Sequence, residues 1–586
     1  MTYKSTRGGE KGVSFAEAVL KGIAADGGLF VPEQNVRFDS LELAEMCELD
    51  YKALAAHIFK RYADDFSDSE IEYCVDRAYG SSSRFDGADP APVVRLNETL
   101  SVLELWHGPT AAFKDMALQI LPAFMSVALK KNRAFAGSPS DCSDAPGAAP
   151  AFPEATPAPA EAASLSFTFT ESTSSAPVAS SALAASSPAS TSSAPAEAPS
   201  RSFESAAPRR PEKIAILTAT SGDTGKAAME GFRDADGIDI IVFFPEKGVS
   251  EMQRTQMQTQ EGSNVNVVAV RGNFDDAQTG VKKIFADSAF KSLLRAYGYR
   301  LSSANSINIG RLIPQVVYYF HAYFSLVRAE RISLGEPVNF VVPTGNFGDI
   351  LAAYYAYKNG LPVGRLICAT NSNSVVSDFI RSGFYNANRD FQVTISPAMD
   401  ILISSNLERL IYDMSCEDEK TTSKLMAELS AAGCYNVDRS TLSGITNMFW
   451  SDNSTEDETR RTISDVWDQF GYLIDPHTAV GVNVFDKYVI STGDLTPTVA
   501  VATASPFKFN TSVAESIFDC PKDVSEFAVQ RKLSEMTGVD IPIPLTGLDK
   551  KPLLHTGVCD KDRMRDEVLN FLVNGRSDNA TTGADN

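Results

Sequence analysis

One lysine in this sequence has surroundings that suit covalent chemistry. Lys114 follows a β-rich run at 102–105 and a short loop of aromatic and small residues, and a helix is predicted to begin beside it. Partial burial and the positive end of a helix both favour the neutral amine, the form that makes an imine with a carbonyl. Most lysines in such places are ordinary surface residues, so the assignment depends on further groups.

Residues 220–225 form a second candidate loop, between a predicted buried strand and a helix. Their hydroxyl and amide groups could hold an anionic substrate, although the same pattern fits a turn with Ser221 or Asp223 as helix N-cap. The loop is not a phosphate-binding P-loop, because Thr220 replaces its first glycine and Ala227 its closing Ser or Thr. No magnesium site of that kind is therefore predicted.

Two more loops could bind anions. Residues 343–349 place glycines at the start of a predicted helix over 350–358, where unpaired backbone amides can hold a phosphate without a lysine. Residues 305–311 place Arg311 near two amides and a hydroxyl, which suits a second phosphate or a carboxylate. The sequence has no GxGxxG, HExxH or GxSxG motif that would indicate another chemistry.

The elements around these loops follow the pattern of parallel sheets. Past residue 212, short β-rich runs alternate with helical patterns, and several runs lead straight into the loops described above. Ligands of such sheets bind outside the carboxyl ends of the strands, which is where these loops would lie. The sequence therefore predicts an α/β fold. The predicted strands are 214–218, 238–244, 265–270, 338–342, 365–370 and 498–503.

From about residue 134 to 211 the composition changes abruptly. Most residues there are Ala, Pro, Ser or Thr, and such a tract buries too little apolar surface to offset its ordering entropy. We predict a disordered insert, preceded by a helix over 117–128 that Pro122 kinks and followed by the strand 214–218. The entropic cost of closing a loop rises only slowly with its length, so the segments on both sides of the insert can belong to one fold. A linker between independent domains is the alternative.

Charge and composition exclude several partners and sites. The 586 residues carry a net charge of −21, with a pI near 4.8, which disfavours nucleic acid and anionic membranes. No run of 18 apolar residues could span a bilayer and residues 1–9 lack the features of a secretory signal, so we expect a cytoplasmic protein. The eight cysteines include no CxxC pair and the five histidines are far apart, so we expect neither disulfides nor a metal site.

Taken together, the motifs resemble threonine synthase, of the subgroup with a long N-terminal extension. This family belongs to the pyridoxal-phosphate (PLP) enzymes of fold type II, the tryptophan-synthase-β-like fold. The resemblance covers essentially all of 1–133 and 212 to about 520. The matching motifs, in order, are residues 3–8, 25–32, 109–115, 220–225, 305–311, 345–349 and 396–400.

The resemblance implies two open α/β domains with an N-terminal extension and the disordered internal insert. The boundaries that we expect are 1–95 for the N-terminal domain, 96–133 for the cofactor-lysine segment, 134–211 for the insert, 212–330 for a small α/β domain, 331–515 for a large PLP-binding α/β domain, and 516–586 for a C-terminal segment with a disordered tail.

The resemblance also implies a role for each loop. Lys114 would bind PLP covalently, and Thr503 would be the hydroxyl partner of the pyridine nitrogen, which leaves that nitrogen less firmly protonated than an acid would. The loop around the cofactor phosphate would be Gly345, Asn346, Phe347 and Gly348. The residues that hold the carboxylate or phosphate of the substrate, O-phosphohomoserine, would be Ser221, Thr224, Asn305, Ser306 and Arg311.

The reaction that the resemblance implies converts O-phospho-L-homoserine and water to L-threonine and phosphate. Lys114 would shuttle protons at Cα and Cβ, phosphate would leave from Cγ, and water would add at Cβ. We therefore expect a lyase of threonine biosynthesis with a small-molecule substrate, no nucleic-acid or membrane partner and no metal, acting as a monomer or homodimer.

Two features depart from the family pattern, and two alternatives stay open. The family has His and Ala where this chain has Ser505 and Phe507, and the insert 134–211 is not a family feature. One alternative is another fold-type-II enzyme, such as a threonine dehydratase or a lyase of phosphorylated substrates; the 305–311 loop counts against a dehydratase, whose substrate has no phosphate. The other is a non-catalytic relative that uses the insert as an interaction arm, and the retained Lys114 counts against it.

Overall fold

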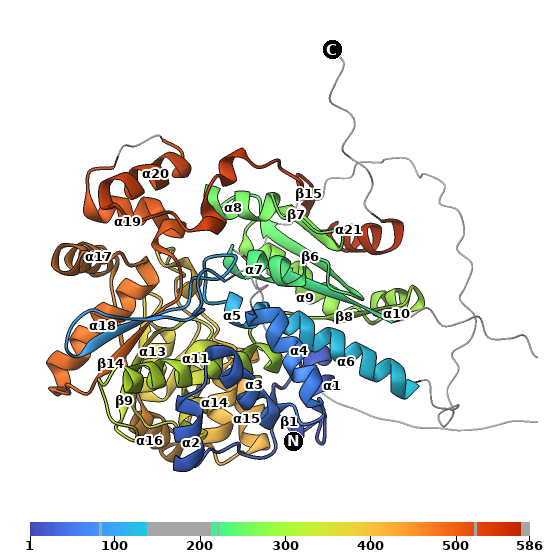
Figure 1. Ribbon diagram of the computed structural model, residues 1–586. Coiled ribbons are helices and arrows are strands. Elements are labelled where there is room, and N and C mark those ends of the chain that lie inside the picture. Colours follow the sequence, from blue (N-terminus) through green and yellow to red (C-terminus); the bar gives the residue numbers. More distant parts are fainter. Residues whose placement is uncertain (81–84, 137–211, 221, 521–523, 576–586) are drawn as a thin grey trace, which may run out of the picture. The chain divides into compact units, whose positions relative to one another are not determined.

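The computed structural model describes residues 1–80, 85–136, 212–220, 222–520 and 524–575 (Figure 1). Ser221 and the predicted insert, apart from its first three residues, lie outside the described residues. The described residues on the two sides of the insert belong to one compact unit. None of the described helices is both long and apolar enough to cross a membrane.

A five-stranded parallel sheet follows the insert, with strand order β15-β7-β6-β5-β8. Its strands are β5 (Lys213–Ala219), β6 (Ile238–Pro245), β7 (Val265–Arg271), β8 (Tyr299–Ser302) and β15 (Val558–Asp560). The three strands predicted in this part of the chain are all present. The C-terminal segment supplies β15, which lies at one edge of the sheet beside β7.

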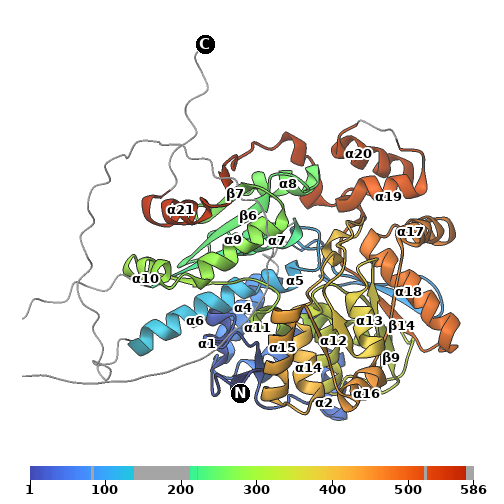
Figure 2. The same cartoon turned by 180° about the vertical axis from the view of Figure 1, so that it is seen from behind.

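Helices cover both faces of this smaller sheet, as the alternation of its side chains requires (Figure 2). Ile216 and Val242 face the buried cluster that includes α7, whereas Leu217 and Phe243 face α9 and α10. The helices of this part are α7 (Asp223–Phe232), α8 (Glu251–Gln258), α9 (Phe274–Ala286), α10 (Ser288–Ala296) and α21 (Met564–Leu569).

A six-stranded sheet forms the larger part, with strand order β13-β10-β9-β14-β4-β3. All of its pairs are parallel except β3 with β4. Its strands are β3 (Val93–Arg95), β4 (Leu100–Glu104), β9 (Val338–Pro343), β10 (Val363–Thr370), β13 (Phe449–Asn453) and β14 (Thr498–Ala502). Glu104 pairs with Ala502 at the carboxyl ends of β4 and β14, so the loops that follow these two strands start side by side.

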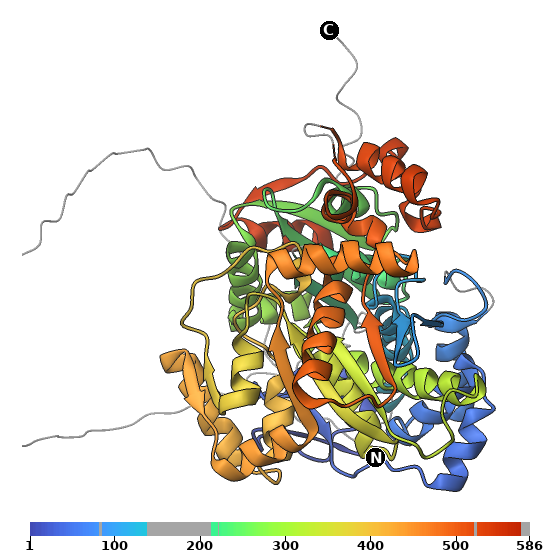
Figure 3. The same cartoon turned by 90° about the vertical axis from the view of Figure 1, so that its left-hand side faces the viewer.

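Each face of the larger sheet is covered by helices. On one face α18 (Pro476–Thr492) contacts β9, β10, β13 and β14, and α17 (Glu456–Phe470) packs against α18 (Figure 3). The other face packs against α11 (Ile309–Arg328), α12 (Gly348–Lys358) and α13 (Val375–Ser382). The remaining elements after α13 are β11 (Phe384–Asn386), α14 (Leu407–Met414), α15 (Glu419–Ala432), β12 (Cys434–Asn436), α16 (Arg439–Met448), α19 (Asn510–Ile517) and α20 (Glu526–Thr537).

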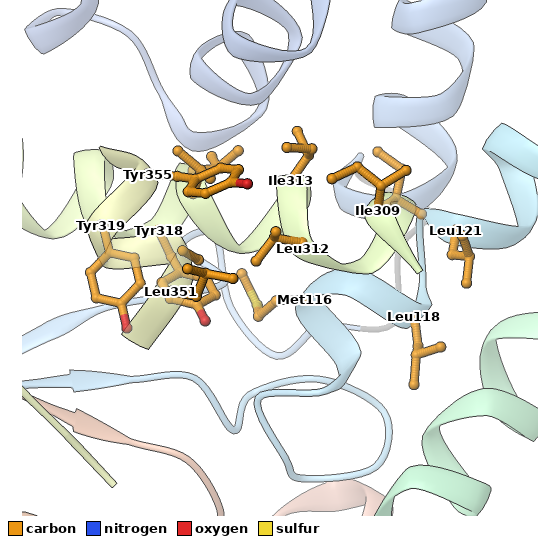
Figure 4. Packing of buried hydrophobic residues seen from close by; sticks show 14 of the residues in the cluster. Met116, Leu118, Leu121, Ile309, Leu312, Ile313, Tyr318, Tyr319, Leu351 and Tyr355 are labelled. Atoms are coloured by element: carbon orange, nitrogen blue, oxygen red, sulfur yellow. The ribbon is translucent and has the colours of Figure 1, made fainter. Parts of the chain in front are cut away.

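Helix α11 is almost completely buried and joins the parts of the core. Its apolar side chains Ile309, Leu312 and Ile313 lie against those of the helices around Lys114 and of α12 (Figure 4). The N-terminal elements pack here too, because α1 and α3 both contact α11. These elements are β1 (Tyr3–Ser5), α1 (Phe15–Lys21), β2 (Phe30–Pro32), α2 (Ser40–Cys47), α3 (Tyr51–Tyr62) and α4 (Asp68–Tyr79).

The prediction of one kinked helix over 117–128 is wrong. The structure has two helices there, α5 (Asp115–Leu118) and α6 (Leu121–Ala136). Pro122 is the second residue of α6, where its missing N–H would have no partner within the helix in any case. Proline therefore begins a helix at this point instead of bending one.

Candidate active site

Lys114 stands at the point where the loop after β4 turns into α5, and its side chain is buried. The loop is fixed from within: Asp115 accepts hydrogen bonds from the backbone N–H and the hydroxyl of Thr110, both at 2.8 Å. It is also fixed from the next strand, because the N–H of Phe113 donates to the carbonyl oxygen of Thr503 at 2.8 Å. The predicted lysine thus occupies a rigid, enclosed position.

The Lys114 amine has one close anionic partner. Its Nζ lies 3.3 Å from Oδ2 of Asp223, the first residue of α7. Burial lowers the pKa of Lys114, the Asp223 carboxylate opposes that change, and the nearby cations Lys508 and Arg311 lower the pKa further. Helix α5 has only one turn, so burial and neighbouring charges account for this shift.

Asp223 lies between two buried ammonium groups. Its Oδ1 is 2.9 Å from Nζ of Lys508, which also donates to the carbonyl oxygen of Thr110 at 2.9 Å. Gln253 donates to the same carboxylate oxygen at 2.9 Å. Burial alone would raise the pKa of Asp223, but Lys508 and Lys114 together hold it well below its usual range. The carboxylate is therefore ionised.

The loop from Gly345 to Gly348 connects β9 to α12. Phe347 has a left-handed backbone (φ 62°), and a Cβ on Gly345 would lie 2.8 Å from the carbonyl oxygen of Ala398, so no larger residue fits there. The carbonyl oxygens of Gly345 and Asn346 accept hydrogen bonds from other parts of the chain. The first N–H groups of α12, in contrast, have no acceptor within the helix and can bind an anion.

The loop at 305–311 leads into α11. Arg311 is buried with 3% of its surface exposed; its Nη1 donates to the carbonyl oxygen of Ala304 at 2.9 Å, while its Nε has no hydrogen-bond partner among the described residues. Burial lowers its pKa to about 10. Ser306 is half-buried, and a Cβ on Gly348 would lie 3.9 Å from its Cβ. The 305–311 and 345–348 loops therefore meet.

The remaining predicted site residues are Thr224, Asn305 and Thr503. Thr224 is half-buried in the first turn of α7, next to Asp223. Asn305 is exposed, and its Oδ1 accepts a hydrogen bond from the Thr218 hydroxyl at 3.2 Å. Thr503 directly follows β14 and is buried beside the Lys114 loop. The structure thus brings the predicted loops to one region.

Family models and individual relatives both match this chain, and all of them point to the same family. The family model for the threonine synthase N terminus matches residues 2–79, and the model for the C-terminal part of threonine synthase matches 478–538. The threonine synthase of Pseudomonas aeruginosa is 34% identical over 520 residues, covering 88% of this chain and 90% of that protein. The chain belongs to the threonine synthase family. The Schizosaccharomyces pombe threonine synthase is 32% identical over 536 residues, 88% of each chain.

Solved structures of threonine synthases share the fold. That of PLP-bound threonine synthase from Brucella melitensis has a TM-score of 0.75, 32% identity and 98% coverage of both chains. The yeast threonine synthase structure has a TM-score of 0.76, 28% identity, and coverage of 98% of this chain and 99% of that one. The predicted α/β fold of the PLP-dependent threonine synthases is therefore confirmed.

Sequence reasoning missed several groups that a threonine synthase site of this kind contains. Asp223 was considered only as a helix cap, but Gly222 holds the cap position and the carboxylate faces Lys114 and Lys508. The signal available for Lys508 was its place in the same family pattern as Thr503. No local signal marks Asn406, whose backbone and side-chain N–H groups both donate to the carbonyl oxygen of Asn346.

His477 is a further buried residue close to the Gly345 loop. Its Nε2 accepts a hydrogen bond from the N–H of Ala398 at 3.1 Å, so the proton is on Nδ1, which donates to Asp475 at 2.7 Å. Ala398 is the residue whose carbonyl oxygen closes over Gly345. The histidine therefore supports the Gly345 loop through the backbone of Ala398.

The two residues that differ from the threonine synthase pattern, Ser505 and Phe507, lie beside the Lys114 loop. Ser505 is fully buried; its N–H donates to the carbonyl oxygen of Ala111 at 3.1 Å, and its hydroxyl accepts from the N–H of Phe507 at 3.3 Å. Phe507 belongs to the buried apolar cluster that also contains Ala111. Both residues therefore serve the packing of the loop that carries Lys114.

Proposed function

We propose that this chain is a PLP-dependent threonine synthase that converts O-phospho-L-homoserine and water to L-threonine and phosphate. One observation carries the proposal: a buried lysine with a lowered pKa lies close to a buried arginine with an unpaired donor, at the meeting point of two anion-binding loops. Such a constellation suits a substrate that has an amino acid at one end and a phosphate at the other.

The residues present fit PLP. Lys114 offers an amine whose neutral form is favoured by burial, and residues 345–348 offer a tight backbone turn that leads into the N-terminus of α12. In this proposal Lys114 would bind the cofactor covalently, Gly345 to Gly348 would hold its phosphate, and the Thr503 hydroxyl would be the partner of its pyridine nitrogen. A neutral hydroxyl in that place leaves the nitrogen less protonated than a carboxylate would.

When bound, PLP supplies an electron sink for negative charge that develops next to the amino group of the substrate. Lys114 then acts as the proton carrier at Cα and Cβ, and burial lowers its pKa in the direction that makes the amine a readier proton acceptor and donor. Asp223 receives no proton in this scheme, because its pKa lies well below its usual range. Its fixed charge orients the Lys114 ammonium.

Arg311 is the proposed binder of the substrate phosphate, which leaves from Cγ before water adds at Cβ. Among the residues that the structure describes, the Nε of Arg311 has no acceptor, and a phosphate oxygen could accept its hydrogen bond. Asn305, Ser306 and Thr224 are proposed to complete the polar contacts of the substrate. Ser221 shares this proposed role and lies outside the described residues.

We also propose the remaining properties of the protein. The net charge of −21 supports an enzyme that binds neither nucleic acid nor anionic membranes, and we propose a cytoplasmic location. We propose a monomer or a homodimer. Residues 212–330 and 331–515 are proposed as the small and large domains, since each contains most strands of one sheet.

The test is the release of both phosphate and threonine from O-phosphohomoserine by the purified, PLP-loaded protein. We expect equal amounts of the two products, and loss of both in Lys114→Ala. The matched control is Lys358→Ala, which removes a lysine that pairs with Asp413 at the far end of α12. Release of phosphate without threonine, or an active Lys114→Ala variant, would refute the proposal.

A further inference from the structure

Arg409 connects three separate parts of the molecule through one buried guanidinium. Its side chain, 1% exposed, donates from Nε to the carbonyl oxygen of Phe30 at 3.0 Å. Nη1 donates to Oδ1 of Asn406 at 2.6 Å, and Nη2 to the carbonyl oxygen of Ile307 at 2.6 Å. The three partners belong to β2, to the start of α14 and to the 305–311 loop.

Asn406 passes this connection on to the cofactor-phosphate loop. Its backbone N–H and its Nδ2 both donate to the carbonyl oxygen of Asn346, at 3.2 and 3.1 Å. The same Nδ2 would lie 3.3 Å from a Cβ on Gly348. The side-chain amide of Asn406 therefore packs against Gly348 as well as against Asn346. Asn406 is itself fully buried.

We propose that Arg409 is a positioning residue that holds the cofactor-phosphate loop and the substrate loop in fixed relation, acting on the former through Asn406. The proposal rests on the proposed function, because it assigns ligands to the two loops. A guanidinium has donors in a planar fork and can serve three acceptors in different directions. A lysine ammonium, which is compact and more strongly hydrated, cannot hold the same three.

The helices behind the two loops are linked independently of Arg409. Oδ1 of Asp349, in the first turn of α12, accepts hydrogen bonds from the hydroxyls of Tyr318 at 2.5 Å and Tyr319 at 2.6 Å on α11. This contact keeps α11 and α12 docked when Arg409 is changed. An Arg409 variant should therefore fold, and its effect should be confined to the loops.

A neighbouring ion pair provides the matched control. Glu408, the residue before Arg409, accepts two hydrogen bonds from the guanidinium of Arg7, at 2.9 and 2.8 Å, and one from the Thr6 hydroxyl. This pair also ties the N-terminal segment to α14, but it contacts neither loop. Glu408→Gln should weaken that tie and leave ligand binding unchanged.

The test compares Asn406→Ala, Arg409→Lys, their double variant and Glu408→Gln. Two affinities are measured, that of PLP for the cofactor-free protein and that of inorganic phosphate for the PLP-loaded protein. Asn406→Ala should weaken PLP about three- to tenfold and leave phosphate binding within twofold. Arg409→Lys should weaken both at least fivefold. The double variant should bind PLP no more weakly than Arg409→Lys, because the two residues act in series.

Several outcomes would overturn the proposal. The first is an Arg409→Lys protein whose affinities for PLP and for phosphate both stay within twofold of wild type. The second is a double variant in which the losses of PLP affinity of the two single variants add up. The third is a loss of affinity in Glu408→Gln as large as that in Arg409→Lys. If Arg409→Lys does not fold, hydrogen exchange in Asn406→Ala decides: exchange should rise at 345–348 and stay unchanged at 305–311, which Arg409 still holds through Ile307, and the absence of a rise at 345–348 would refute the proposal. None of these measurements needs turnover, so failure of the proposed reaction is seen separately.

Discussion

The Nζ of Lys114 lies 3.3 Å from the Asp223 carboxylate, although the two residues are 109 positions apart in the chain. Burial lowers the pKa of the lysine and the carboxylate opposes this, so Asp223 sets how readily the amine becomes neutral. Lys508, 2.9 Å from the same carboxylate, shares its charge. One buried carboxylate therefore serves two buried lysine side chains.

This balance predicts the effect of removing the anion. Asp223→Asn leaves two buried ammonium groups without a counter-charge, so we expect it to reduce the free energy of unfolding by about 3–5 kcal/mol. The double change Asp223→Asn with Lys508→Met removes one of those charges and should recover a good part of the loss. Urea unfolding of the cofactor-free proteins measures both. Equal stabilities of the single and double variants would show that Lys508 does not share the charge of Asp223.

The assignment of the cofactor to Lys114 makes a chemical prediction. The PLP-loaded protein should be yellow, and borohydride should reduce the imine and attach the cofactor permanently to Lys114. Peptide mapping by mass spectrometry locates the adduct. Lys226 and Lys508 are the internal controls, because both are close to the same loops. An adduct on either of them would reassign the cofactor lysine.

The role of Arg311 predicts a loss specific to the substrate. Arg311→Ala should cost about 1.5–3 kcal/mol of binding, roughly one to two decades in kcat/KM for O-phosphohomoserine. The absorption spectrum of the bound cofactor should not change. Steady-state kinetics and a visible spectrum of the same sample measure the two effects. Near-native kcat/KM would remove Arg311 from the site.

Much of the fold follows from the sequence because long strands and their loops carry a local signal. All six predicted strands are present, and each end differs by no more than two residues from the structure, as at β10, where Val363 precedes the predicted start. The three-residue strands, such as Val93–Arg95 and Val558–Asp560, were not predicted. Three residues are too few to show a periodicity, and their pairing depends on distant parts of the chain.

The sequence predicted which loops form the candidate site, but it did not predict which residues those loops contact. Glycines after the predicted strand 338–342 identified residues 345–348, and an arginine near two amides and a hydroxyl identified residues 305–311. The partners of those loops come from far along the chain: Arg409 reaches Phe30 across 379 positions. Such pairs leave no local pattern in one sequence, and a buried Arg or Asp there looks like any charged residue on a helix.

The buried carboxyl of Asp349 predicts a pH dependence of stability. Burial raises its pKa to about 6, above the ordinary value of 3.8. The folded state therefore binds the proton more tightly than the unfolded state, and this contribution to stability is lost as the pH rises from about 4 through 6. Asp349→Asn keeps an oxygen for the two tyrosine hydroxyls and has no proton to lose.

We therefore compare Asp349→Asn with wild type across this range. The variant should gain about 2–3 kcal/mol of unfolding free energy relative to the cofactor-free wild-type protein between pH 4 and 6.5, and the difference should stay constant above that. Urea unfolding at closely spaced pH values measures it. A difference that does not vary with pH would show that Asp349 titrates normally in the folded protein.

The central claim is that phosphate leaves from the carbon Cγ and that water then adds at Cβ. The most direct test is turnover of O-phosphohomoserine in water labelled with oxygen-18, with mass spectrometry of both products. The account predicts one labelled oxygen in the hydroxyl group of threonine and none in the phosphate released. Label in the phosphate, with homoserine as the other product, would show hydrolysis of the phosphate ester and would contradict the account.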